Sequence, residues 1–86
     1  MVANRRSSID IVADILRLGE SNKTRVMYQV NMSHAQLESY LIFLIDRNLI
    51  EQKTDPVGKS VYSPTEQGQV LLQHIERVQL MMGSDS

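Results

Sequence analysis

The amino-acid sequence predicts a small, mainly α-helical protein with one β-hairpin. Two capping boxes, at Ser7 and Ser33, each precede apolar residues that recur every three or four positions, as on one face of a helix. Asp55-Pro56-Val57-Gly58 is typical of a tight turn between two strands. Apolar residues in heptad spacing then follow near the end of the chain. The predicted order is helix, helix, helix, hairpin, helix.

The first helix begins after Ser7, whose side chain forms a capping box with Asp10. Gly19 ends it, because glycine enters the left-handed conformation without a Cβ clash. Residues 1–6 lack any periodicity and are predicted to form a flexible arm. One face of the helix carries the apolar residues Ile9, Val12, Ala13 and Leu16.

A short second helix is predicted over residues 25–30, after a polar connector at residues 20–23. Thr24 is the expected N-cap and Asn31 the expected end.

The third helix is predicted over Ser33–Arg47, and Asn48 ends it in the left-handed conformation. The inner face is expected to hold Leu37, Leu41, Leu44 and Ile45. The opposite face holds Gln36, Ser39 and Phe43. An exposed Phe43 has three interpretations: packing on the base of the hairpin, which we favour, contact with a thymine methyl group, or a protein interface.

The hairpin is predicted to have a three-residue loop, Pro56 to Gly58. The expected strand pairs are Lys53 with Val61 and Gln52 with Tyr62. In this register Ile50 and Tyr62 lie on one face and close over the core.

Pro64 ends the second strand and Thr65 caps the last helix. Along this helix a heptad seam is formed by Leu71, Ile75, Val78 and Met82. Three short helices cannot cover the whole seam, so its second half is expected to pair with a second copy of the chain. The predicted homodimer interface is Ile75, Val78, Gln79 and Met82. The predicted organisation is therefore a DNA-binding unit at 7–64, a dimerisation helix at 65–82 and a disordered tail at 83–86.

Two helices joined by a tight turn and followed by a hairpin describe a winged helix-turn-helix. The runs IVADILRL, TRVMYQVNMSHAQLESYLIFLIDRNLI and VYSPTEQG resemble archaeal winged helix-turn-helix regulators of the ArnR-like type. They also resemble the related small dimeric archaeal chromatin proteins. The resemblance covers roughly residues 8–80. It implies DNA binding, transcriptional regulation and pairing of the last helix with its copy as an antiparallel coiled coil.

By the same resemblance, Ser33–Arg47 is the recognition helix and the hairpin around Pro56–Lys59 is the wing. Relatives carry lysines on the exposed face of the recognition helix, where this chain has Glu38 and Ser39. Because phosphates set affinity and base edges set specificity, the two tasks can fall to different elements. The residues predicted to contact bases are Ser33, His34, Gln36, Ser39 and Tyr40. The residues predicted to contact phosphates are Arg5, Arg6, Lys23, Arg25, Lys53 and Lys59.

Composition limits the other function classes. The chain has no cysteine and a net charge of −1, which argues against a non-specific coat on nucleic acid. No metal site, cofactor or catalytic set of residues is predicted, and therefore no enzyme. Short apolar runs predict a soluble, cytoplasmic protein outside the membrane. The alternative is a winged-helix module that binds protein instead of DNA, which the net charge and the acidic residues Glu38 and Asp46 favour.

Overall fold

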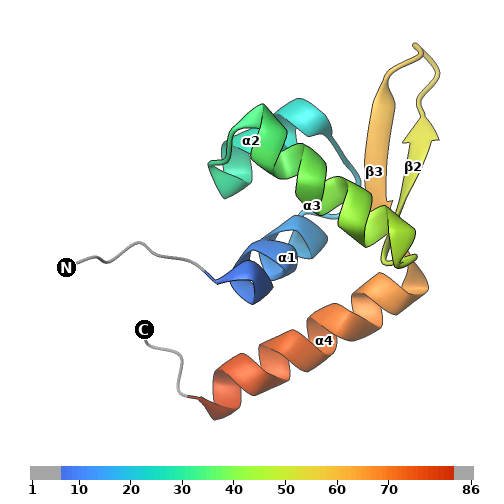
Figure 1. The fold of residues 1–86 in the computed structure, drawn as a ribbon. Coiled ribbons are helices and arrows are strands. Elements are labelled where there is room, and N and C mark those ends of the chain that lie inside the picture. Colours follow the sequence, from blue (N-terminus) through green and yellow to red (C-terminus); the bar gives the residue numbers. More distant parts are fainter. Residues whose placement is uncertain (1–6, 83–86) are drawn as a thin grey trace.

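A computed structural model describes residues 7–82, which form four helices and a three-stranded antiparallel sheet (Figure 1). The elements are α1 (Ser8–Arg17), β1 (Ser21–Asn22), α2 (Lys23–Val30), α3 (His34–Asp46), β2 (Ile50–Thr54), β3 (Ser60–Pro64) and α4 (Glu66–Met81). The predicted order of helices and hairpin is confirmed. The predicted arm at residues 1–6, with Arg5 and Arg6, and the predicted tail at residues 83–86 lie outside the described residues.

Both predicted capping boxes are present. Ser7 Oγ accepts from the Asp10 amide at 3.2 Å, and the Asp10 carboxylate accepts from the Ser7 amide at 3.3 Å. Ser33 and Gln36 make the same reciprocal pair at the start of α3, both bonds at 3.2 Å. Each box satisfies two backbone groups that the first helical turn leaves without partners.

The start of α2 differs from the prediction. Asn22, not Thr24, is the N-cap, and its side-chain oxygen accepts from the Arg25 amide at 2.8 Å. Asn and Thr both cap helices well, so residue type alone does not decide between them. The extended backbone at Asn22 makes this residue the cap. Thr24 therefore lies within the first turn of α2. The predicted end is correct, since Asn31 has a left-handed φ of 54°.

The sheet has the strand order β1-β3-β2. Its hairpin has the predicted register, with Gln52 opposite Tyr62 and Lys53 opposite Val61. The Asp55 amide donates to the Lys59 carbonyl at 2.8 Å and closes the predicted three-residue loop. The short strand β1, however, lies within the stretch predicted to be a polar connector. It pairs Ser21 with Tyr62, and two polar residues carry no alternating pattern that could have predicted a strand.

One apolar core joins all four helices to the hairpin. Its buried members are Val12, Ala13, Ile15, Leu16, Val26, Val30, Leu37, Leu41, Leu44, Ile50, Tyr62 and Ile75. Ile50 and Tyr62 close the sheet side of the core as predicted. Ile45 does not join it and is 37% exposed, because it lies about 100° around the α3 axis from Leu44.

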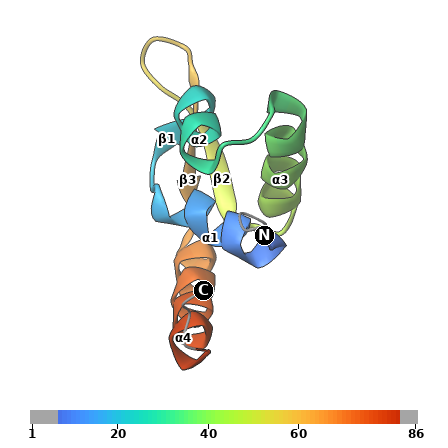
Figure 2. The same ribbon diagram turned by 90° about the vertical axis from the view of Figure 1, so that its left-hand side faces the viewer.

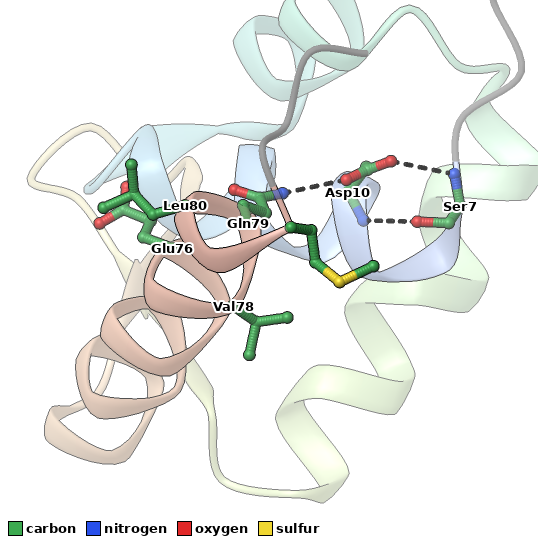
Figure 3. A pocket seen from close by; sticks show the side chains of 7 residues that line it. Ser7, Asp10, Glu76, Val78, Gln79 and Leu80 are labelled. Carbon is green, nitrogen blue, oxygen red and sulfur yellow. Dashed lines mark hydrogen bonds between the residues drawn. The ribbon is translucent and has the colours of Figure 1, made fainter.

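The helix α4 packs apolar side chains against the core and makes two further contacts with the rest of the molecule. Near its start, Gly68 lies so close to Leu49 that a Cβ atom at Gly68 would collide with the Leu49 carbonyl oxygen. Further along, a polar network ties it to α1. Arg17 donates to Glu76 at 2.9 Å and to Gln79 at 3.2 Å. Gln79 in turn donates to Asp10 at 3.0 Å, a contact shown in Figure 3.

This packing corrects one residue of the predicted dimer interface, Ile75, and engages a second, Gln79, in bonds within its own chain. Ile75 is only 6% exposed and belongs to the core of its own chain. The side-chain amide of Gln79 accepts from Arg17 and donates to Asp10 of its own chain. The heptad pattern did not distinguish apolar residues that face their own domain from those that face outward. Val78 and Met82 are exposed and remain available to a partner.

Within residues 7–82, no helix is both long and apolar enough to cross a lipid bilayer.

Candidate nucleic-acid interface

Three elements predicted to meet DNA lie at one end of the molecule. The helix α2, the start of α3 and the tip of the β2–β3 hairpin all lie in the upper half of Figures 1 and 2. The helix α4 extends away from them at the opposite end. A duplex that approaches this end of the protein would therefore reach the start of α3 and the hairpin tip without meeting the last turns of α4.

The side chains predicted to contact bases already make hydrogen bonds within the protein. Ser33 and Gln36 bond each other's backbone amides in the capping box. Ser39 Oγ donates to the Ala35 carbonyl at 3.4 Å. Tyr40 is half-buried and its hydroxyl donates to Ser8 Oγ at 3.1 Å, so it faces α1. The spacing predicted the capping box, but it gave no information about the bonds of Ser39 and Tyr40.

An ion pair connects α2 to α3. The Lys23 ammonium donates to Glu38 Oε1 and lies 3.4 Å from His34 Nε2. The hydrogen bond to Glu38 raises the pKa of Lys23 above 10.5, and the same bond lowers the pKa of Glu38 below 4.5. Lys23 was predicted to contact a phosphate. Glu38 occupies its ammonium, and this pair neutralises an acidic residue on the predicted recognition helix.

The other predicted cations differ in how free they are. Arg25 on α2 and Lys59 at the hairpin loop are exposed, and within residues 7–82 neither forms an ion pair. Lys53 is exposed and lies 3.7 Å from Glu51. Arg17, by contrast, is bound by Asp14, Glu76 and Gln79. Among the described residues predicted to contact phosphates, Arg25 and Lys59 are therefore the most accessible.

Phe43 lies on the side of α3 that faces α1, which corrects the favoured interpretation of packing on the base of the hairpin. With Ser8, Val12 and Tyr40 it lines a shallow apolar cavity. The guanidinium of Arg47 lies over its ring, 4.9 Å from the centroid. Phe43 therefore packs beside α1 and under Arg47.

Ile42 was in none of the predicted contact sets, yet it is 59% exposed on α3. It lies opposite the buried residues Leu37, Leu41 and Leu44, on the helix face that also carries Ala35. A helical wheel would have identified it, because Ile42 falls on the side of the wheel opposite Leu37 and Leu44. Tyr28 on α2 was also overlooked and is 83% exposed.

Within the described residues, no three His, Cys, Asp or Glu side chains come together to hold a metal ion.

Comparisons with known proteins place this geometry in context. A sequence model of the family described as winged helix-turn-helix matches residues 5–83. An uncharacterised protein of Methanocaldococcus jannaschii, MJ0290, is 35% identical over 77 residues, which are 86% of this chain and 34% of that protein. The chain thus spans about a third of the length of that relative. A second uncharacterised protein of the same organism, MJ0287, is 31% identical over 67 residues, 69% of each chain.

Among solved structures, the chain is similar to the crystal structure of Sso10a-2, a DNA-binding protein from Sulfolobus solfataricus. The TM-score is 0.81 at 29% identity, over 91% of this chain and 83% of the other. The agreement extends over the helices and the hairpin together, so it confirms the predicted winged helix-turn-helix fold.

Proposed function

Because this chain belongs to the winged helix-turn-helix family, which has archaeal members, we propose that it binds double-stranded DNA and regulates transcription as a homodimer. The helix α3 enters the major groove, and the β2–β3 hairpin acts as the wing. One observation carries the proposal: an exposed helix start, Arg25 and Lys59 belong to the elements gathered at the end of the molecule away from α4.

The proposed contacts divide between two tasks. Arg25, Lys53 and Lys59 neutralise phosphates and set the register on the duplex. The start of α3 at Ser33 places the positive end of the helix dipole near a further phosphate. The same helix contributes His34, whose ring is exposed beside Lys23, to the base edges.

Low charge favours sequence preference over a general coat. Non-specific affinity grows with the number of neutralised phosphates, and this chain has a net charge of −1. A few phosphate contacts leave discrimination to the groove, as a regulator requires.

The dimer is proposed to form through the last turns of α4. The last turns of this helix expose Val78, between the network residues Glu76 and Gln79, and Leu80, Met81 and Met82, beyond them. Together with Ser7 and Glu76, the residues Val78, Leu80 and Met82 line a cavity at the end of α4, and Figure 3 shows Val78 and Leu80 on different sides of the helix. Exposed apolar side chains concentrated at one end of a helix are typical of an interface. A two-fold axis there repeats the α3 helices in opposite orientation, so a palindromic site is expected.

DNA binding is tested by titrating duplexes of random sequence at about 50 and about 200 mM salt, followed by fluorescence anisotropy. We expect binding that weakens steeply as the salt concentration rises. Arg25→Gln and Lys59→Gln should each reduce the salt slope by about 0.9 per protomer. Arg77→Gln, an exposed charge on α4, is the matched control and should leave the slope unchanged. Absence of binding at the lower salt concentration would contradict the proposal.

Dimerisation is tested by sedimentation of the wild type and of the double variant Val78→Asp/Met82→Asp. We expect a dimer for the wild type and a monomer for the variant. Val70→Asp changes an exposed valine near the start of the same helix and should remain dimeric. A wild type that is monomeric at all accessible concentrations would remove the dimer from the proposal.

The alternative, a module that binds protein, has one observation in its favour. The outer side of α3 carries Ile42 and Asp46 and no cation before Arg47 at the helix end. If no duplex binds at low salt, this outer side becomes the predicted protein-binding surface. Ile42→Asp would then disrupt the complex while leaving the fold intact.

A further inference from the structure

The outward stripe of α3 is unlike the polar surface expected of a helix that hydrogen-bonds to bases. Ala35, Ser39, Ile42 and Asp46 follow one another at intervals of four, three and four residues, so they share one face. All four are exposed, and they lie opposite the buried Leu37, Leu41 and Leu44. We call this face the outward stripe.

The outward stripe presents methyl groups more than hydrogen-bonding groups. Ala35 offers only its Cβ, and the hydroxyl of Ser39 donates to the Ala35 carbonyl. Ile42 is 59% exposed and is absent from the core and from the side chains packed against it. The first three residues of the stripe thus carry no charge.

Beyond His34 at its start, the polar side chains of α3 beside the stripe are engaged within the protein. Gln36 spends its side-chain oxygen on the capping box, and Tyr40 donates its hydroxyl to Ser8. Glu38 is paired with Lys23. Phe43, the other aromatic candidate, packs beside α1 under Arg47. Ile42 is therefore the large apolar side chain that α3 presents most openly on its outward face.

The major groove offers one apolar group on its base edges, the 5-methyl group of thymine. Small apolar side chains on a recognition helix contact it and exclude water from it. From Ala35 to Ile42 the helix rises about 10 Å, which is close to the width of the groove. Both residues can therefore lie inside the groove at once.

We propose that Ile42 recognises a thymine 5-methyl group, with Ala35 packing against the same groove edge. The inference rests on the proposed DNA binding and adds the base that this chain prefers. This contact explains why Ile42 is exposed to solvent on the proposed recognition helix. It also accounts for specificity without lysine on the outward stripe.

The experiment uses duplexes selected from a random library by the full-length wild type. The selected pool is amplified with dTTP or with dUTP, which gives the same sequences with and without the 5-methyl groups. We expect the wild type to bind the thymine pool more tightly, by about fourfold for each methyl group contacted. Ile42→Ala should weaken binding to the thymine pool and remove the difference between the two pools.

Ile9→Ala is the matched control. Ile9 is an isoleucine of nearly equal exposure, 56%, but it lies on α1. This variant should keep both the affinity and the difference between the pools. Because both isoleucines are exposed, thermal unfolding should show that neither variant loses its fold.

Two results would overturn the inference. The wild type could bind both pools equally, or Ile42→Ala could keep the full preference for thymine. Either result leaves DNA binding intact and removes only the thymine contact. Failure of the wild type to bind any duplex at low salt would instead remove the proposed function, and this inference with it.

Discussion

The helices α3 and α4 both hold apolar side chains in solvent, yet their surroundings differ. On α3, Ile42 lies on a helix anchored along its length by buried leucines, and the start of this helix lies at the end of the molecule that carries α2 and the hairpin tip. On α4, Leu80 and Met82 lie beyond the last contact with α1. Exposure alone therefore does not identify a partner. The position and the anchoring of the helix that carries the exposed residue favour DNA for α3 and a second copy for α4.

The two helices also differ in how they are held. Leu37, Leu41 and Leu44 bury the inner side of α3 in the core. The helix α4 contributes Ile75 to the core and packs Leu71 and Leu72 against it, and it also makes the close contact at Gly68 and the polar network around Arg17. Apolar burial is worth more than exposed polar contacts. The end of α4 should therefore be the more easily loosened of the two.

The largest expected effect sharpens the difference between the two sides of α3. Leu41→Ala should lower the free energy of unfolding by about 2–5 kcal/mol, because it leaves a cavity in the core. Its neighbour Ile42→Ala should change that free energy by no more than about 0.5 kcal/mol, because Ile42 is exposed. Urea denaturation followed by circular dichroism measures both. Equal losses would show that the outward stripe is part of the core.

A smaller effect is expected where α4 meets the rest of the molecule. Gly68→Ala places a Cβ atom against the Leu49 carbonyl and near the Leu16 side chain, so α4 must shift. We expect a loss of about 1–3 kcal/mol, although alanine favours a helix more than glycine does. Gln67→Ala, an exposed position in the same turn, is the control and should not destabilise. A neutral Gly68→Ala would mean that α4 is held loosely from its start.

The polar network between α1 and α4 should contribute less. Arg17→Gln removes the bonds to Asp14 and Glu76, which are both partly exposed, so we expect a loss of about 1 kcal/mol. The loss should diminish at high salt, because exposed pairs are screened. Hydrogen exchange in the last turns of α4 should accelerate in this variant. Unchanged exchange there would indicate that apolar packing, not the polar network, holds the end of the helix.

The smallest effect is the pH dependence of the pair that joins α2 to α3. Lys23 lowers the pKa of Glu38, so the stability from Glu38 is present above pH 4.5 and is lost as the pH falls through the lowered pKa. The pKa of Lys23 is raised, so its contribution is present below pH 10.5 and is lost as the pH rises through the raised value.

Glu38→Gln tests this assignment. The variant should be slightly less stable than the wild type near neutral pH, and the difference should vanish in acid, where Glu38 is protonated. Melting temperatures of both proteins across the acid range measure it. A difference that persists at the lowest pH would show that packing of Glu38, not its charge, is responsible.

Features set by neighbouring residues were predictable from the sequence. The capping boxes at Ser7 and Ser33 and the register of the hairpin follow from side chains and turn residues a few positions apart. The end of α3 at Asn48 likewise depends on one residue that tolerates a positive φ.

Features set by packing between distant segments were not predictable in this way. The strand β1 exists because β3 offers it a partner. Ile75 lies in the core because α1 lies beside α4. The residues predicted to contact bases lie at the start of α3 and along it, as the periodicity predicted, but the ion pair of Lys23 with Glu38 and the bond from Tyr40 to Ser8 join elements that periodicity treats separately.

The location of the DNA surface can be measured directly by NMR, with ¹⁵N-labelled protein titrated with a selected duplex. The account predicts that the largest amide shifts fall in the first turn of α2, at residues 33–42 and at the hairpin loop, residues 55–59. Amides in the middle of α4 should move little. Shifts concentrated on α4, with α3 and the hairpin unaffected, would contradict it.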